Sequence, residues 1–175
     1  MHNGQTWNGF DWERAEANWN AWWAGQLDRP LIWITRKDRT TPLPAAPEFV
    51  PHLPDELSVD EIIARYEAHL DATIHHADAV PKWFVNYGAG ITAAFLGARV
   101  EADDHTVWFH PSEHKPIDEI HPTFDETNVW WQRVRNVTAT AVDRWAGRAA
   151  VSYTDLGGKP PGLVNVRHRG GIRPV

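Results

Sequence analysis

The sequence of 175 residues contains no cysteine and a single methionine. Without cysteine the chain can form neither disulfides nor thiolate metal sites, and chains of this kind are typical of the cytoplasm. It also lacks an uninterrupted apolar run of about 18 residues, the length that a membrane-spanning helix needs. Residues 1–14 do not show the basic segment followed by an apolar segment that marks a secretory signal. We therefore expect a cytoplasmic protein without a membrane segment.

Positive charge is also scarce, because 17 Lys and Arg stand against 23 Asp and Glu, for a formal net charge of −6. Nucleic-acid-binding proteins usually show a basic excess, so we expect no nucleic-acid partner. Residues 159–175 are the exception, with four cations, three prolines, three glycines and no acid. We interpret residues 1–158 as one domain, and residues 159–175 as an irregular basic tail of the kind that a frameshifted or artificial end produces.

Tryptophan is abundant, at 11 residues, and helps to predict the first elements. Apolar residues at helical spacing predict an amphipathic helix over residues 11–25 that packs on a larger body. Residues 31–35, LIWIT, predict a short buried strand, which a proline-rich loop follows. Ser58 and Glu61 form a capping box that opens a second helix, whose apolar face continues to His75 and His76.

The second half of the chain predicts further strands and helices in alternation. Residues 83–86 predict a strand, and residues 98–102 and 106–110 predict a side hairpin. A helix over 128–145, capped by Asp125 or Thr127, precedes a buried strand at 149–153. This alternation is typical of an α/β fold with parallel strands, in which ligands bind at the carboxyl ends of the strands.

Polar candidates follow the three strands predicted for such a parallel sheet. Arg36, Asn86 and Asp155 each come just after an apolar run. In a parallel sheet these residues would converge on one face.

Several segments resemble parts of one enzyme family. RPLIWITRKDR, residues 29–39, is similar to the N-terminal segment of uroporphyrinogen decarboxylases, in which a Pro-Val-Trp strand leads into two arginines. DAVPKWFVNYGAGITAAFLGARVE, residues 78–101, is similar to the second strand and following helix, including the Leu-Gly-x-x-Val ending. The helix of 128–145 and AAVSYTDLGG are similar to the next unit. The resemblance covers roughly residues 10–158 and is distributed along the chain, without a single diagnostic motif.

The resemblance implies an α/β chain that forms the N-terminal half of a (β/α)8 barrel, with an N-terminal helix and a side hairpin. It implies cofactor-free decarboxylation of a carboxylate-rich, tetrapyrrole-type substrate, and no bound metal or cofactor. Arg36 corresponds to the family's first carboxylate-binding arginine, and Arg39 falls one residue short of the second. Guanidinium groups suit this task because they bind carboxylates bidentately.

Two positions depart from the family pattern. Where the decarboxylases carry an aspartate after the second strand, this chain has Asn86 and Tyr87, and Asp155 stands where the family usually has a glycine-rich loop. We interpret Asn86 and Asp155 as candidate catalytic residues and Tyr87 as a candidate substrate-binding residue. The family's later tyrosine, histidine and zinc ligands would lie beyond residue 158. We therefore expect this chain to be catalytically silent. A homodimer is one possible state of the full-length form.

Two other functions remain open at this point. The same family includes zinc-dependent methyltransferases that act on corrinoid proteins, and the chain could also be a non-catalytic fragment or binding module. His110, Glu113 and His114 are spaced as metal ligands, but Pro111 and Pro116 favour a loop without fixed geometry, so solvated histidines are the preferred interpretation.

Overall fold

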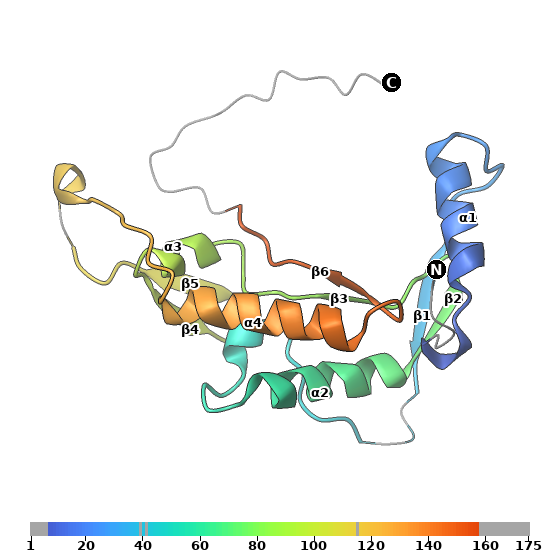
Figure 1. Ribbon diagram of the computed structural model, residues 1–175, viewed down its shortest axis with the longest axis horizontal. Helices are drawn as coiled ribbons and strands as arrows, with labels where there is room; N and C mark the ends of the chain where they lie inside the picture. The colour runs from blue at the N-terminus through green and yellow to red at the C-terminus, as the bar shows by residue number, and fades with distance from the viewer. Residues whose placement is uncertain (1–6, 39, 41, 115, 158–175) are drawn as a thin grey trace.

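The computed structural model describes residues 7–38, 40, 42–114 and 116–157. Within these residues the chain is a mixed α/β structure with four α-helices and three two-stranded sheets. Figure 1 shows strands β3 and β6 running beside helix α4, with α2 beneath them and α1, β1 and β2 at one end. The β4–β5 hairpin and α3 lie at the other end. The described strands form no closed barrel.

The N-terminal helix is confirmed. After a 3₁₀ turn, η1 (Trp7–Gly9), helix α1 spans Trp12–Trp23, and the Asp11 side chain caps it by accepting from the backbone N–H of Arg14 at 2.9 Å. Of the apolar residues on its predicted face, only Ala15 is fully buried, whereas Trp23 is 74% exposed. The packed face of α1 is therefore narrower than the sequence indicates.

The first strand differs from the prediction. Strand β1 spans Trp33–Lys37, is exposed along its whole length, and pairs antiparallel with β2, Thr73–Ala77. The sequence predicts that residues 73–76 end the second helix, but α2 spans Val59–Asp71. The β-branched residues Thr73 and Ile74 favour an extended strand once the helix has ended. The buried parallel strand expected at 31–35 is therefore wrong.

The capping box that predicts the start of α2 is confirmed. The Ser58 hydroxyl accepts from the backbone N–H of Glu61, and the Glu61 carboxylate accepts from the backbone N–H of Ser58 at 2.8 Å. A second 3₁₀ turn, η2 (Val50–His52), lies in the proline-rich loop before it.

The parallel strand pair is also confirmed. Strand β3 spans Lys82–Phe84 and pairs in parallel with β6, Ala150–Ser152, in the register Phe84 to Ser152. Between them come α3 (Ile91–Phe95), the antiparallel hairpin of β4 (Arg99–Ala102) and β5 (Val107–His110), a 3₁₀ turn η3 (Ile117–Glu119), and α4 (Val129–Arg144). This is one β–α–β crossover, the repeating unit of α/β folds.

The helices cover one face of the parallel pair. Helix α4 packs against α2, α3 and β6, and Tyr66 of α2 meets the Trp83 ring of β3 with 4.3 Å between centroids. Because successive strand residues point to opposite faces, Trp83 is 8% exposed on the helix side, whereas Phe84 is 44% exposed on the other. One side of the β3–β6 sheet is therefore open.

The core lies between this sheet and helices α2 and α4. Its largest fully buried hydrophobic side chains are Trp145, Tyr87, Ile62, Ile63, Ile91, Val50, Val85 and Val137. None of the helices in the described part of the chain is long and apolar enough to cross a membrane.

Helix α4 is capped by a residue other than the two that the sequence suggests. The Asn128 side chain accepts from the backbone N–H groups of Trp130 at 2.9 Å and Trp131 at 3.1 Å, and its amide donates to the Ala94 carbonyl at 3.0 Å. Asp125 instead accepts from Thr127, in the loop before the helix. Asn128 thus both starts α4 and ties it to α3.

We expect Asn128→Ala to lower the free energy of unfolding by about 1–2 kcal/mol, because it removes a helix cap and a bond between two helices. Urea denaturation followed by circular dichroism measures this change. Thr127→Ala is the matched control and should cost about 0.5 kcal/mol or less, since Thr127 is exposed. Equal losses in the two variants would show that Asn128 is not the cap that matters.

Candidate functional site

The carboxyl ends of β3 and β6 are held together by backbone and side-chain hydrogen bonds. The N–H of Val85 donates to the Ser152 carbonyl at 3.3 Å, and the N–H of Tyr87 donates to the Thr154 hydroxyl at 3.0 Å. Asn86 and Asp155 thus follow paired strands and lie at the same edge of the sheet, as the sequence predicts. Thr154 is 1% exposed and is a structural residue of this edge that the sequence prediction did not include.

Asn86 is built into the turn that follows β3. Its side chain is 8% exposed, and Oδ1 accepts from the backbone N–H of Gly88 at 3.1 Å. Gly88 has φ +84°, and a Cβ there would lie 2.9 Å from the Val107 Cβ. Only glycine therefore fits, and the turn lies directly against the β4–β5 hairpin. Asn86 brings an amide to the edge of the sheet but no charge.

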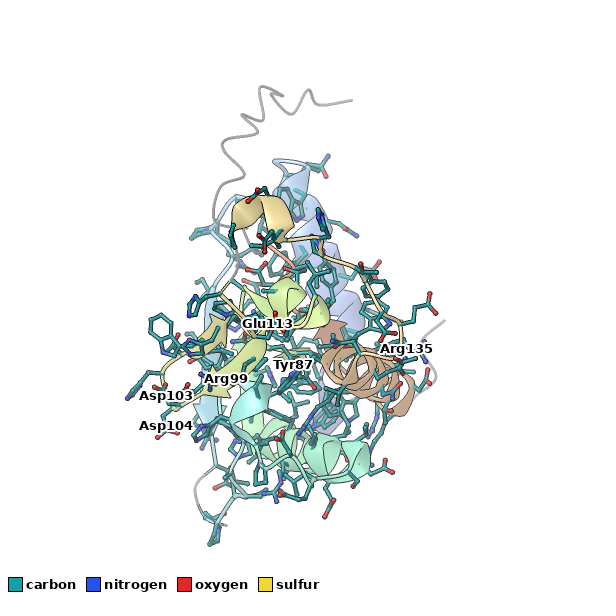
Figure 2. All side chains as sticks on the ribbon, turned by 90° about the vertical axis from the view of Figure 1, so that its left-hand side faces the viewer. Tyr87, Arg99, Asp103, Asp104, Glu113 and Arg135 are labelled. Atoms are coloured by element: carbon teal, nitrogen blue, oxygen red, sulfur yellow. The ribbon has the colours of Figure 1, made fainter. Side chains whose placement is uncertain are left out.

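Tyr87 lies on the helix side of the sheet rather than on the open side. It shares its direction with Val85 and Trp83 along the extended backbone, is 0% exposed, and packs edge-on against Trp130 of α4. Figure 2 shows it in the interior, beside α4. Among the described residues its hydroxyl has no hydrogen-bond partner.

Burial raises the pKa of Tyr87 well above its usual range, and the nearby Arg133 guanidinium opposes this rise. The phenol is therefore neutral, and it faces the helix layer. The sequence predicts Tyr87 as a substrate-binding residue, but its hydroxyl does not reach the open side of the sheet.

Asp155 is the carboxylate at this edge of the sheet. Its side chain is exposed, and Oδ1 accepts from the backbone N–H of Gly157 at 2.7 Å, which shapes the turn after β6. A carboxylate that is exposed and has one oxygen engaged in a turn retains acceptor capacity for a ligand.

Arg36 does not join Asn86 and Asp155. It lies on β1 opposite Ile74, and β1 pairs with β2 rather than with the β3–β6 sheet. Of the three strand ends predicted to converge, only those that carry Asn86 and Asp155 lie together. Strand β1 pairs with β2, whereas the alternation of strands and helices in the sequence predicts that it joins the parallel sheet. Arg39, the second predicted arginine, lies outside the described residues.

The Arg36 guanidinium is exposed and makes no hydrogen bond or ion pair within the described part of the chain. Hydrogen bonds from the backbone and side chain of Thr40 lower the pKa of Asp38, and the charge of Arg36 adds to that effect. Arg36 influences Asp38 by electrostatic attraction without a hydrogen bond, so the guanidinium N–H groups are available to bind an anion.

A buried acid that the sequence prediction missed lies between β2 and β3. Asp78 is 0% exposed and accepts from both terminal nitrogens of Arg29, at 2.6 and 3.0 Å, from the N–H of Ile32 at 2.8 Å, and from the Asn18 amide at 3.0 Å. The bonds from Arg29, followed by that from Ile32, hold the pKa of Asp78 well below its usual range. This network joins α1 to the segment before β1. Arg29 and Asp78 are 49 residues apart in the sequence, so no local pattern indicates that they pair.

Two of the hollows on the surface of the described residues are large enough for a small ligand. One, of about 760 Å³, lies between η1, the end of α2 and β2, and the other, of about 620 Å³, lies between α1 and the starts of β1 and β3. Arg36, Asn86, Tyr87 and Asp155 line neither. No group of three or more His, Cys, Asp or Glu side chains in the described residues is arranged to hold a metal ion.

In comparisons with known proteins, no family model, curated protein or solved structure matches this chain.

Proposed function

We propose that this chain supplies the substrate-holding part of an α/β carboxy-lyase similar to uroporphyrinogen decarboxylase. The proposed reaction is the cofactor-free decarboxylation of a carboxylate-rich substrate of the tetrapyrrole class. The observation that carries the proposal is the Arg36 guanidinium, which is exposed and engages no acid within the described residues. An exposed guanidinium on the antiparallel β1–β2 pair, with no acid partner among the described residues, is suited to bidentate binding of a substrate carboxylate.

The parallel pair provides further support. Helices cover one face of β3 and β6, the other face is open at Phe84, and polar groups stand at the carboxyl ends. Such a unit is the building block of α/β barrels, where substrates bind at that end.

The chemistry assigns a different task to each polar group. Decarboxylation of an acetate group on a pyrrole breaks the bond between the carboxylate carbon and its neighbour, releases CO₂, and requires a proton in its place. Arg36, on the β1–β2 sheet, would hold a substrate carboxylate remote from the reacting carbon, and Asp155, at the edge of the β3–β6 sheet, would deliver the proton that replaces the lost carboxylate. Asn86 can orient a pyrrole N–H but supplies no charge to a cationic intermediate.

We expect Arg36→Gln to weaken the binding of uroporphyrin, an octacarboxylate, by about tenfold, the loss typical of one charge-assisted bidentate pair. Calorimetric titration at fixed salt concentration measures the dissociation constant. Arg135→Gln is the matched control, because Arg135 is also exposed but lies on α4, and it should bind uroporphyrin like the unmodified chain.

Equal weakening in the two arginine variants would mean that binding follows general positive charge and not a site at Arg36. Binding of methylcobalamin without binding of uroporphyrin would replace this proposal by the corrinoid-type alternative.

A further inference from the structure

The hollow between α1 and the strands is lined by tryptophan rings and one lysine. Trp12, Ala15, Glu16 and Trp19 of α1 form one wall, and Trp33 of β1 and Lys82 of β3 form the other. In Figure 1, α1 lies beside β1 at the end of the molecule remote from the hairpin.

On the α1 side of the hollow, a small side chain lies between two large ones. Ala15 is 1% exposed and lies between Trp12 and Trp19 on one helix face, where its small methyl group leaves space between the two indoles. Trp19 is held in place, because its Nε1 donates to the Asp78 carbonyl at 3.1 Å and its ring meets Trp33 edge-on at 6.0 Å. Trp19 and Trp33, two of the three rings in the lining, are therefore positioned by contacts within the protein.

The cation of the hollow is Lys82. Its Nζ lies 4.3 Å from the centroid of the Trp33 ring, and no carboxylate within the described residues forms an ion pair with it. A cation over an indole is attracted to the ring face, yet it keeps its N–H donors for other partners. Lys82 is exposed, so an anion can reach it from solvent, and the indole ring beside it shields the contact on one side only.

We propose that this hollow binds a small aromatic monocarboxylate, with the ligand's ring against the three tryptophans and its carboxylate on Lys82. Aromatic walls with one convergent charge are typical of sites for flat organic ligands. Glu16, which lines the same hollow, disfavours a second negative group on the ligand.

This site is separate from the one proposed around Arg36. Trp33 and Arg36 lie three residues apart on β1, so their side chains point to opposite faces of the strand. A ligand in the tryptophan hollow therefore does not compete with a carboxylate on Arg36.

The test is a titration of the full chain with 2-naphthoate, followed by the indole N–H resonances in NMR spectra. We expect saturable shifts with a dissociation constant of about 1 mM or lower, in keeping with ligands of this size. Lys82→Met should weaken binding at least about fivefold, and Lys82→Arg should restore most of it. Lys37→Met is the control, since Lys37 is the other lysine in the described part of the chain and lies outside the hollow.

Three results would overturn the proposal. These are the absence of saturation, equal affinities in Lys82→Met and the unmodified chain, and tighter binding of 2-naphthylmethylammonium than of 2-naphthoate. The last would mean that Glu16 and the indoles select a cation. Arg36→Gln should leave 2-naphthoate binding unchanged, so failure of the uroporphyrin experiment and failure of this one are distinguishable.

Discussion

Replacing Trp145 with alanine is expected to lower the free energy of unfolding by about 3–5 kcal/mol, the usual cost of removing a large buried aromatic side chain. Trp145 is the C-cap residue of α4 and is 0% exposed. Its ring meets those of Trp7 and Trp83 edge-on, at 5.7 and 5.4 Å between centroids. Its Nε1 also donates to the Glu67 carboxylate of α2 at 3.3 Å. Alanine would leave a cavity where η1, α2, α4 and β3 meet.

Urea denaturation followed by circular dichroism is the measurement, because 11 tryptophans make fluorescence hard to assign. A domain of this size is stable by about 5–15 kcal/mol, so the variant will be marginal, and Trp145→Phe provides a milder version with a smaller loss. Trp23→Ala is the control, because Trp23 is 74% exposed, and it should change stability by about 0.5 kcal/mol or less. A loss for Trp145→Ala no larger than that of the control would contradict the assignment of Trp145 to the centre of the core.

Elements with local end signals could be predicted from the sequence. The Ser58–Glu61 capping box starts α2, and Gly147, with φ +72°, ends the α4 segment. Strand β2 could not be predicted in this way, because the apolar spacing of α2 continues through residues 73–76 and only pairing with β1 makes them extended. That pairing is a tertiary contact, so helical periodicity gave the wrong answer.

The unforeseen pairing of β1 with β2 also decides which residues of the candidate site could be placed from the sequence. Asn86 and Asp155 follow strands that pair in parallel, so placing them at one edge required only the order of the elements. Arg36 required the partner of β1 to be known. The direction of Tyr87 could have been predicted, since it has the same parity as Trp83 and Val85, which read as core residues.

Replacing Asp78 with asparagine is expected to lower the free energy of unfolding by about 2 kcal/mol at neutral pH. The amide keeps the shape but loses the charge that binds Arg29. Its N–H₂ group replaces one carboxylate oxygen, so it faces either the Arg29 and Asn18 donors of Oδ1 or the Arg29 and Ile32 donors of Oδ2. Fully buried pairs cost about 3–5 kcal/mol when broken. The Arg29 side chain is 39% exposed, so water screens part of this attraction and the loss is smaller.

The pH dependence distinguishes the lost charge from a general packing defect. The Asp78 pKa is lowered in the folded chain from its ordinary value of 3.8, so in the acid range just below that value the unfolded chain binds more protons. The stability that Asp78 contributes is therefore fully present above about pH 5 and is lost as the pH falls toward the folded pKa. The difference between the unmodified chain and Asp78→Asn should shrink in the same window.

Denaturation curves at pH 7 and pH 3 measure this change, with Asp104→Asn as the control, because Asp104 is exposed and pairs only with His52 among the described residues. A difference between the unmodified chain and Asp78→Asn that stays constant with pH would mean that the charge on Asp78 does not stabilise the fold. The carbonyl of Asp78 also accepts from Trp19 Nε1, so the same network that joins α1 to β1 holds one wall of the tryptophan hollow. Asp78→Asn is thus expected to broaden the indole resonance of Trp19 more than Asp104→Asn does, because a weakened network lets α1 move against the strands.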